Sequence, residues 1–187
     1  MWLGVFAVSC KERLLLVGFE WYEEEVVAFL HKSVYEEIGL VVEFAAKLAI
    51  PKEAYNVLRG QYLASTLVES LLLVPRREKD IVLGISAEDI YEPNLNFVFG
   101  LASPLLGVGV IGLKRLHNSF YGLVEDRALF LRRTATEAHH ETGHMLGLSH
   151  CPNPHCVMHF SNTLQETDRK GYRFCLSCHR KLEQKLC

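Results

Sequence analysis

The sequence predicts an α/β fold in which helices cover a mixed sheet. Short apolar runs alternate with longer stretches whose apolar residues recur at helical spacing, which is typical of α/β proteins. A chain of 187 residues is long enough for one compact domain with a substantial core. Apolar residues make up 49% and charged residues 22%, so we expect an ordinary globular protein.

Strands are expected at three apolar runs in the first part of the chain. Leu3–Val8 and Leu14–Phe19 are short runs separated by the polar turn Lys11-Glu12-Arg13. Leu40–Ile50 is a third run, which Pro51 stops.

Two helices are expected among these strands and after them. The first, Glu20–Glu37, has apolar residues near helical spacing and an acidic first turn, and Gly39 ends it. The second, Gln61–Val74, is ended by Pro75. The charged run Arg76–Asp80 that follows is interpreted as a solvated loop.

Two buried strands and one edge strand are predicted next. Ile81–Ile85 and Val108–Leu113 are compact apolar runs, buried on both faces if they pair in parallel. The segment Asn96–Leu101 lies between them and is bracketed by Pro93 and Pro104. Prolines at both ends suit an edge strand better than a central one.

A long helix is predicted over Arg127–Leu146, and it carries the beginning of a metal-binding motif. From His140 to His150 the sequence reads H-E-x-x-H-x-x-G-x-x-H. His140 and His144 are four residues apart, so on a helix their imidazoles project from the same face onto one ion. Glu141 lies beside the first ligand, where its carboxylate can take a proton from a zinc-bound water.

The second half of the motif completes a catalytic type of zinc site. Gly147 is the residue best able to leave a helix through a left-handed turn, which would bring His150 back as a third nitrogen ligand. Three protein ligands leave a fourth position open for water or substrate. The chain has 9 His. These fixed positions would therefore match by chance only about once in ten thousand such sequences, which makes surface histidines the weaker interpretation.

A second metal site is predicted from cysteines that occur in two close pairs. The four residues are Cys151, Cys156, Cys175 and Cys178. Such pairs across a short loop are what a tetrahedral structural zinc needs, although two disulfides or a redox C-x-x-C are alternatives. Disulfides are disfavoured because Met1–Val8 lacks the basic region of a signal peptide. A redox motif usually follows a strand, whereas Cys178 precedes a charged, helix-like tail.

Other thiols and imidazoles match no pattern of their own. Cys10 and Cys187 are interpreted as free thiols. His155, His159 and His179 lie near the cysteines and are candidate substitute ligands. We interpret all three as surface residues, because four cysteines already complete a tetrahedral site.

The motif and the cysteines together resemble the archaemetzincins, a branch of the metzincin zinc peptidases. The matching residues are the H-E-x-x-H-x-x-G-x-x-H motif, Cys151 directly after it, Cys156-Val157-Met158 and Cys175-Leu176-Ser177-Cys178. The resemblance implies a catalytic zinc on His140, His144 and His150, with Glu141 as the general base. It also implies a second, structural zinc on the four cysteines. Met158 stands where the family places the methionine of its Met-turn, a floor beneath the zinc histidines.

The same resemblance implies a metzincin-like fold: a twisted mixed sheet, a backing helix and an active-site helix. Residues 1–150 would form an N-terminal subdomain. Residues 151–187 would form a small zinc-stabilised subdomain with the Met-turn and a closing helix, Leu176–Leu186. The edge strand at Asn96–Leu101 would bind extended substrate by adding main-chain hydrogen bonds, unless it has no role in substrate binding.

The predicted function is a zinc-dependent metallopeptidase that acts on a peptide or protein through zinc-activated water, with two zinc ions as cofactors. A peptide-binding pseudoprotease and a zinc hydrolase of a non-peptide amide are the alternatives. A net charge of −2 gives no argument for binding nucleic acid or membrane surfaces, and no apolar run is long enough to span a bilayer. We expect a cytoplasmic, reducing setting, and no propeptide before a domain that begins near Met1.

Overall fold

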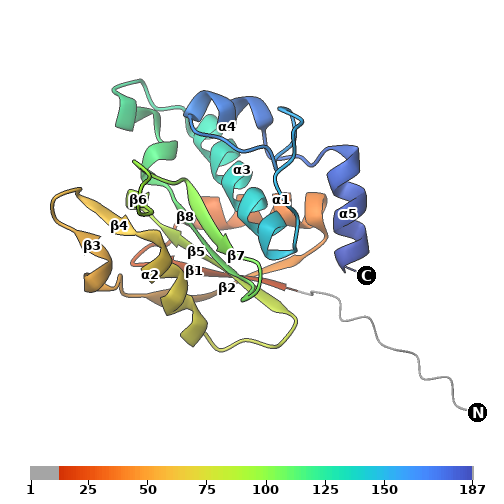
Figure 1. The fold of residues 1–187 in the computed structure, drawn as a ribbon, viewed down its shortest axis with the longest axis horizontal. Coiled ribbons are helices and arrows are strands. Elements are labelled where there is room, and N and C mark those ends of the chain that lie inside the picture. The colour runs from red at the N-terminus through yellow and green to blue at the C-terminus, as the bar shows by residue number, and fades with distance from the viewer. Residues whose placement is uncertain (1–12, 187) are drawn as a thin grey trace, which may run out of the picture.

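The computed structural model describes residues 13–186, which form a five-stranded sheet covered by helices on both faces (Figure 1). The parallel strands, in spatial order, are β2 (Val41–Leu48), β1 (Arg13–Phe19), β5 (Asp80–Ser86) and β8 (Val108–Gly112). Strand β7 (Gly100–Ser103) pairs antiparallel with β8 and forms one edge of the sheet. The predicted α/β fold with a mixed sheet is confirmed.

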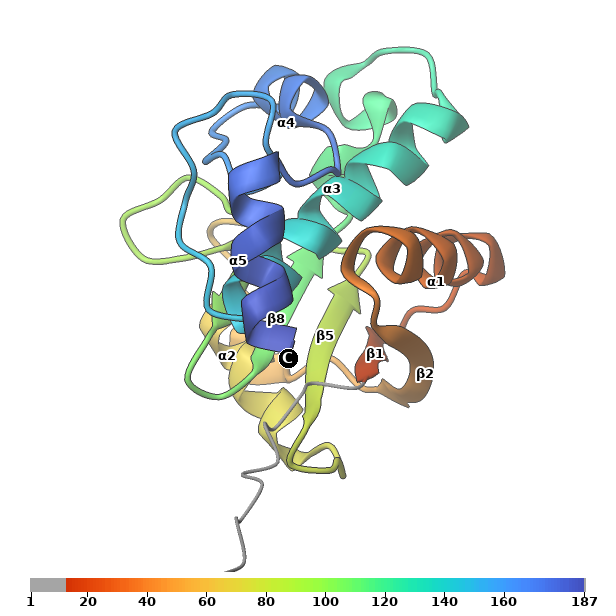
Figure 2. The same cartoon turned by 90° about the vertical axis from the view of Figure 1, so that its right-hand side faces the viewer.

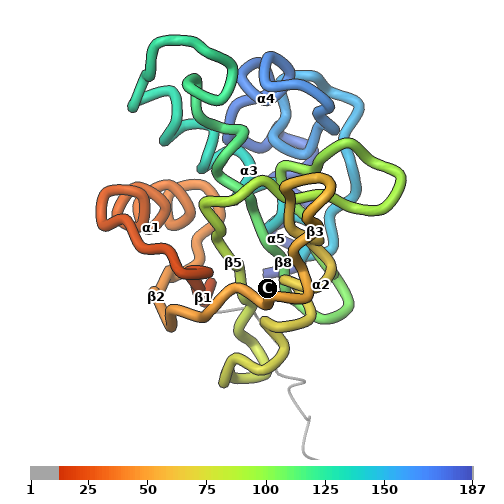
Figure 3. The backbone as a smooth tube through the Cα atoms, turned by 90° about the vertical axis from the view of Figure 1, so that its left-hand side faces the viewer, coloured from red at the N-terminus to blue at the C-terminus, as the bar shows by residue number. Residues whose placement is uncertain are grey.

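Two long helices lie on one face of this sheet and a short helix lies on the other (Figures 2 and 3). The long helices are α1 (Glu24–Ile38) and α3 (Arg127–Met145), and the short one is α2 (Ala64–Ser70). Helices α4 (Leu164–Lys170) and α5 (Leu176–Leu186) follow in the C-terminal segment. Short 3₁₀ turns occupy Lys52–Ala54, Leu71–Leu73, Lys114–Leu116 and Asn118–Tyr121.

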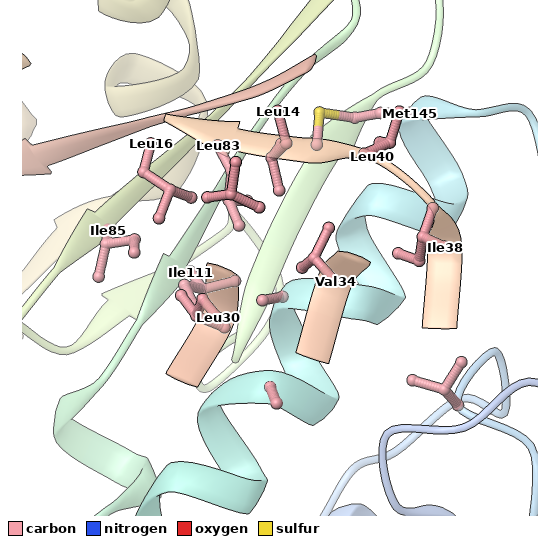
Figure 4. Packing of buried hydrophobic residues seen from close by; sticks show 14 of the residues in the cluster. Leu14, Leu16, Leu30, Val34, Ile38, Leu40, Leu83, Ile85, Ile111 and Met145 are labelled. Carbon is pink, nitrogen blue, oxygen red and sulfur yellow. The ribbon is translucent and has the colours of Figure 1, made fainter. Parts of the chain in front are cut away.

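Alternating residues of the strands fill two separate cores, one on each face of the sheet. In β1, Leu14 and Leu16 join the cluster under α1 and α3, whereas Leu15 and Val17 join the cluster under α2. Successive side chains of a strand point to opposite faces, so a strand buried on both sides must be apolar throughout. Figure 4 shows the first cluster, in which Leu14 and Leu16 face the side chains of α1. The prediction that β5 and β8 are buried on both faces is confirmed.

The first helix ends where the sequence predicted but begins later. Gly39 adopts a left-handed conformation with φ of 84°, and its N–H donates to the carbonyls of Val34 and Tyr35. Residue Glu20, the expected start, has φ of 48°, and its N–H bonds to Leu48 O at the end of β2. The chain therefore turns sharply after β1 before the helix can begin at Glu24.

A second, small sheet was not predicted from the sequence. Its strands are β3 (Tyr55–Asn56), β4 (Gln61–Leu63) and β6 (Ile90–Tyr91), in that order. The prediction of one helix over Gln61–Val74 is therefore wrong for its first three residues, and the α-helix ends at Ser70, where a 3₁₀ turn follows. The backbone of Tyr62 pairs with β3 and β6. The buried side chain of Gln61 donates to Asp89 Oδ2 at 3.1 Å and to Asn96 O at 3.0 Å. These contacts outweigh the helical pattern.

The predicted edge strand at Asn96–Leu101 exists but is displaced along the chain. Strand β7 covers Gly100–Ser103, and Val98 makes only one isolated antiparallel bridge, to Ile90. Residues 92–97 form a loop instead. The carbonyls of Leu95 and Asn96 bond to side chains, which removes them from strand pairing.

The C-terminal segment shares its apolar core with the rest of the chain. Val157, Met158, Phe174 and Leu182 are buried in the same cluster as α1 and α3. Helix α5 occupies the predicted range, Leu176–Leu186. The boundary between subdomains at residues 150 and 151 stays a prediction.

Some expectations fall on the chain ends. The predicted strand Leu3–Val8, Cys10 and Cys187 lie outside the described residues. Within residues 13–186, no helix combines the length and the apolar character needed to cross a bilayer.

Helix α4 is fixed to α3 by a buried ion pair. Lys170 Nζ lies 3.2 Å from Glu137 Oε1, and the two side chains are only 1% and 3% exposed. Thr167 Oγ1 donates to the same carboxylate oxygen at 3.1 Å, and Lys170 also donates to His159 O at 3.3 Å. Breaking a buried pair from one side leaves a charge without compensation, which costs about 3–5 kcal/mol.

We therefore predict that Lys170→Met lowers the free energy of unfolding by about 3–5 kcal/mol, because Glu137 is left buried and unpaired. The double variant Lys170→Met/Glu137→Gln should recover most of this loss. Denaturant titration would measure both.

The matched control is Lys32→Met, because Lys32 pairs with Glu36 at 4.0 Å on the exposed surface of α1. Its effect should stay within about 0.5 kcal/mol. Equal losses for Lys32→Met and Lys170→Met would contradict the assignment of the buried pair.

Candidate functional site

Helix α3 ends in a left-handed turn at Gly147, as the motif predicted. Gly147 has φ of 84°, and its N–H donates to His144 O at 2.8 Å. The N–H of Leu148 donates to Gly143 O at 2.9 Å, which completes a Schellman motif. This turn reverses the chain and returns His150 to the face of α3 that carries His144.

Three imidazoles converge beside the last turns of this helix. His144 Nε2 lies 3.1 Å from His140 Nε2 and 3.3 Å from His150 Nε2. Nitrogens about 2.0–2.1 Å from one tetrahedral zinc would be separated by about 3.3–3.4 Å, so the spacing of these donors fits the metal.

The other ring nitrogens of two of these histidines bind backbone carbonyls. His140 Nδ1 donates to Val157 O at 2.7 Å, and His144 Nδ1 donates to Leu148 O at 2.8 Å. A proton on Nδ1 leaves the Nε2 lone pair free for a metal ion. Burial also lowers the pKa of His140, His144 and His150, which favours the neutral imidazole that metal binding requires.

Glu141 places a buried carboxylate beside the histidines. It is 5% exposed, and it lines the same cleft as His140. Burial, reinforced by the nearby Glu137 carboxylate and opposed by Lys170, raises the pKa of Glu141 to about 8. Strand β7 packs against this carboxylate without an intervening side chain, because the residue there is Gly100.

The cleft between β7 and α3 has a volume of about 580 Å³. The three histidines and Glu141 line it together with Phe99, Leu101 and Phe160. Glu137 and Lys170 also line it but were not anticipated from the sequence. Glu137 lies one helical turn before Glu141, a spacing that could have indicated a second acid on this face. Nothing local marks Lys170, which reaches the cleft from α4.

The four cysteines form the second cluster, within which all ligand atoms lie within 4.8 Å of one another. Cys151 Sγ and Cys175 Sγ are 3.8 Å apart, and none of the four is in a disulfide. Tetrahedral zinc with bonds of about 2.3 Å would separate its sulfurs by about 3.8 Å. A disulfide would need about 2.05 Å. The spacing therefore favours a metal over a pair of disulfides.

The thiols of this cluster influence one another's ionisation. Burial opposes ionisation of Cys175, but hydrogen bonds from the Cys178 backbone and from the other thiols outweigh it and lower its pKa to about 7. Burial raises the pKa of Cys156 and of Cys178. A thiolate is thus most easily formed at Cys175, and a cation would be needed to hold several thiolates together.

The nearby histidines take no part in this cluster among residues 13–186. His159 Nδ1 bonds to Cys151 O at 2.9 Å, and His179 Nδ1 lies 3.4 Å from Glu183 Oε1 on the surface of α5. His155 is exposed.

Met158 lies fully buried against the active-site helix. A Cβ atom at Gly143 would overlap Met158 Sδ, so the glycine allows the helix to lie directly on this side chain. The preceding residue, Val157, supplies the carbonyl that orients His140. The resemblance assigns Met158 to a floor beneath the histidines, and that assignment stays a prediction.

Comparison with known proteins gives consistent results. A model of peptidase family M54 matches residues 12–184. The chain is 41% identical over 182 residues to the archaemetzincin of Pyrococcus furiosus, covering 94% of this chain and 95% of the relative. The crystal structure of the archaemetzincin from Methanopyrus kandleri superposes with a TM-score of 0.83 at 39% identity, covering 97% and 98% of the two chains.

A zinc-dependent peptidase from Methanocorpusculum labreanum is also similar, with a TM-score of 0.79 at 28% identity over 90% of this chain and 99% of the other. The family model covers most of the chain, and the similarity extends over nearly the full length of each of these proteins. The chain is therefore a zinc metallopeptidase that belongs to peptidase family M54, together with the archaemetzincins that it resembles.

Proposed function

We propose that this enzyme hydrolyses peptide bonds in the cleft between β7 and α3, with Glu141 as the general base and His140, His144 and His150 as ligands of the catalytic zinc. The observation that carries the proposal is the convergence of three Nε2 atoms beside a buried carboxylate on the wall of one cleft. Catalytic zinc sites have this composition, with three protein ligands and an open position.

The chemistry divides between the metal and the chain. When bound, zinc supplies a Lewis acid that acidifies water and stabilises negative charge on a peptide carbonyl oxygen. The Glu141 carboxylate accepts the proton of the water that attacks the scissile carbonyl carbon. As the carbon–nitrogen bond breaks, Glu141 returns this proton to the leaving amine. A carboxyl group whose pKa is raised by burial is a stronger base than an ordinary carboxylate, and its protonated form can return the proton to the amine near neutral pH.

The substrate binds in an extended form along β7. This strand is the edge of the sheet, with β8 on one side only, and its Leu101 and Ala102 line the cleft. An open edge can pair with an extended peptide by main-chain hydrogen bonds. Gly100 lets β7 itself lie directly against the Glu141 carboxylate, so the edge that pairs with the peptide lies beside the base.

The four cysteines hold a second zinc with a structural role. Their spacing and their close packing against the core support this assignment. Because four ligands complete a tetrahedral site, this ion has no open position. Four cysteines that are not in disulfides are consistent with a reducing, cytoplasmic setting.

Glu141→Gln tests the base directly. The change keeps the size of the side chain and leaves all three imidazoles in place. We expect the turnover number for peptide cleavage to fall by about 10²–10⁴. Zinc content and melting temperature should stay near wild type.

The control for Glu141→Gln is Glu36→Gln on the exposed surface of α1, which should cleave peptides as wild type does. Cleavage by Glu141→Gln at the wild-type rate would rule out Glu141 as the base. If wild type binds peptides but cleaves none, the chain is a pseudoprotease. If wild type cleaves non-peptide amides but no peptides, the chain is a zinc hydrolase of a non-peptide amide.

Gly100→Ala should disturb Glu141 without removing it. A Cβ at this position would lie 2.6 Å from Glu141 Oε1, so the carboxylate must move away. We expect a loss of roughly 10²-fold in kcat, because small displacements of a catalytic group have effects of this size. Added to Glu141→Gln, the alanine should cause little further loss. Additive losses in the double variant would show that the alanine acts elsewhere.

Metal analysis tests the two zinc assignments. Elemental analysis should give two zinc ions per chain, and X-ray absorption should detect both nitrogen and sulfur ligands. A chelator should remove the histidine-bound ion first, because that site has an open face. Sulfur–sulfur scattering from disulfides in place of zinc–sulfur scattering would overturn the cysteine site.

Two variants, one at each site, distinguish the roles of the two zinc ions. His150→Ala should lose one zinc with a small change in melting temperature. Cys178→Ser should also lose one zinc but melt clearly lower, because metal binding at the cysteines is coupled to folding of the C-terminal segment.

A further inference from the structure

The rim of the cleft opposite α3 includes a loop with no secondary structure. Residues 92–97 connect β6 to β7, and Asn94, Leu95, Asn96 and Phe97 line the cleft. Asn94 has a left-handed φ of 68°, which lets the loop turn sharply. Within the loop the N–H of Leu95 donates to Glu92 O at 3.1 Å, and other parts of the chain supply further hydrogen bonds.

Arg59 holds this loop by its backbone. Arg59 lies in the turn between β3 and β4, and β4 is the strand that lies beside β6 (Figure 1). Its Nη2 donates to Leu95 O at 2.7 Å and to Asn96 O at 2.9 Å. The guanidinium lies 4.3 Å from the centre of the Tyr91 ring, and its Nε donates to Gln61 Oε1 at 2.8 Å. The contacts with Tyr91 and Gln61 therefore fix the orientation of the guanidinium.

A second series of contacts, through Gln61, Asp89 and Arg115, reaches the same loop. Gln61 Nε2 donates to Asn96 O at 3.0 Å and to Asp89 Oδ2 at 3.1 Å. Asp89 accepts two hydrogen bonds from Arg115, at 2.6 and 2.8 Å. The Arg115 guanidinium in turn covers the Phe97 ring, 4.2 Å from its centre.

These contacts suggest a task for the small sheet. Strand β4 and the turn before it contribute no residue to the lining of the cleft, yet they fix the loop that does. A loop that is ordered before substrate arrives does not lose conformational entropy on binding, so the substrate binds more tightly.

We propose that Arg59 is a positioning residue, which holds residues 94–97 in the shape that receives the substrate. This inference rests on the proposed function only in requiring that substrate contacts the rim. Arg59 itself touches neither the histidines nor Glu141, so it acts through the loop.

The experiment compares Arg59→Ala and Arg59→Lys with Arg76→Ala. Arg76 is a matched control, because its Nη2 also donates to a loop carbonyl, Leu106 O at 3.0 Å, and neither residue lines the cleft. Hydrogen exchange of peptides that span residues 92–99 is measured on the substrate-free, zinc-loaded proteins. KM and kcat are measured with a peptide that wild type cleaves.

In Arg59→Ala we expect exchange of the hydrogen-bonded amides of Leu95 and Val98 to rise about tenfold and KM to rise about tenfold, as loss of charge-assisted hydrogen bonds predicts. The turnover number, zinc content and melting temperature should change little. Arg59→Lys should fall in between, because an ammonium lacks the planar fork of the guanidinium. Arg76→Ala should match wild type in both measurements.

Unchanged exchange in Arg59→Ala would overturn the inference, whether or not the protein cleaves peptides. Raised exchange with an unchanged KM would overturn the link to substrate. If wild type cleaves no peptide at all, the proposed function fails, while the exchange data still decide whether Arg59 holds the rim.

Discussion

The histidine cluster and the cysteine cluster both depend on the close packing of helix α3 against the turn at residues 156–158. Gly143 leaves no side chain between them, so the helix lies directly on Met158. At this distance Val157 O can accept the proton of His140 Nδ1, which orients one histidine of the first cluster. On the same turn, Cys156 Sγ faces the other cysteines and accepts a hydrogen bond from a backbone N–H. One short segment therefore sets the geometry of the histidines and of the thiols together.

The charges around the cleft explain why α4 lies where it does. Glu137 and Glu141 are one turn apart on α3 and both are buried, so their charges would repel each other in a medium of low dielectric constant. Lys170 on α4 pairs with Glu137 and opposes the rise in the pKa of Glu141. Helix α4 is held against α3 a second time by Arg133 and Asp168, at 2.6 and 2.8 Å. The short helix thus has an electrostatic reason to pack beside the active-site helix.

The sequence predicts those features that depend on residues close together in the chain. The spacing of His140 and His144 on one helix face and the left-handed turn at Gly147 are local, so the motif indicated them correctly. Strands β3, β4 and β6, of two or three residues each, are too short to produce a detectable period. The edge strand was predicted too early in the chain, because Phe97 and Phe99 alternate as in a strand. In the structure, side chains distant in sequence bind the carbonyls of Leu95 and Asn96, so strand pairing starts later. Contacts between distant residues, such as Lys170 with Glu137, leave no pattern in the sequence at all.

The support of the rim is directed at the main chain, and this has an evolutionary consequence. Arg59 and Gln61 bind the carbonyl oxygens of Leu95 and Asn96, not their side chains. Every amino acid has the same backbone carbonyl, so substitution of Leu95 or Asn96 leaves the supporting hydrogen bonds in place. If the rim receives the substrate as proposed, its side chains can change to suit other peptides while the path of its main chain stays the same.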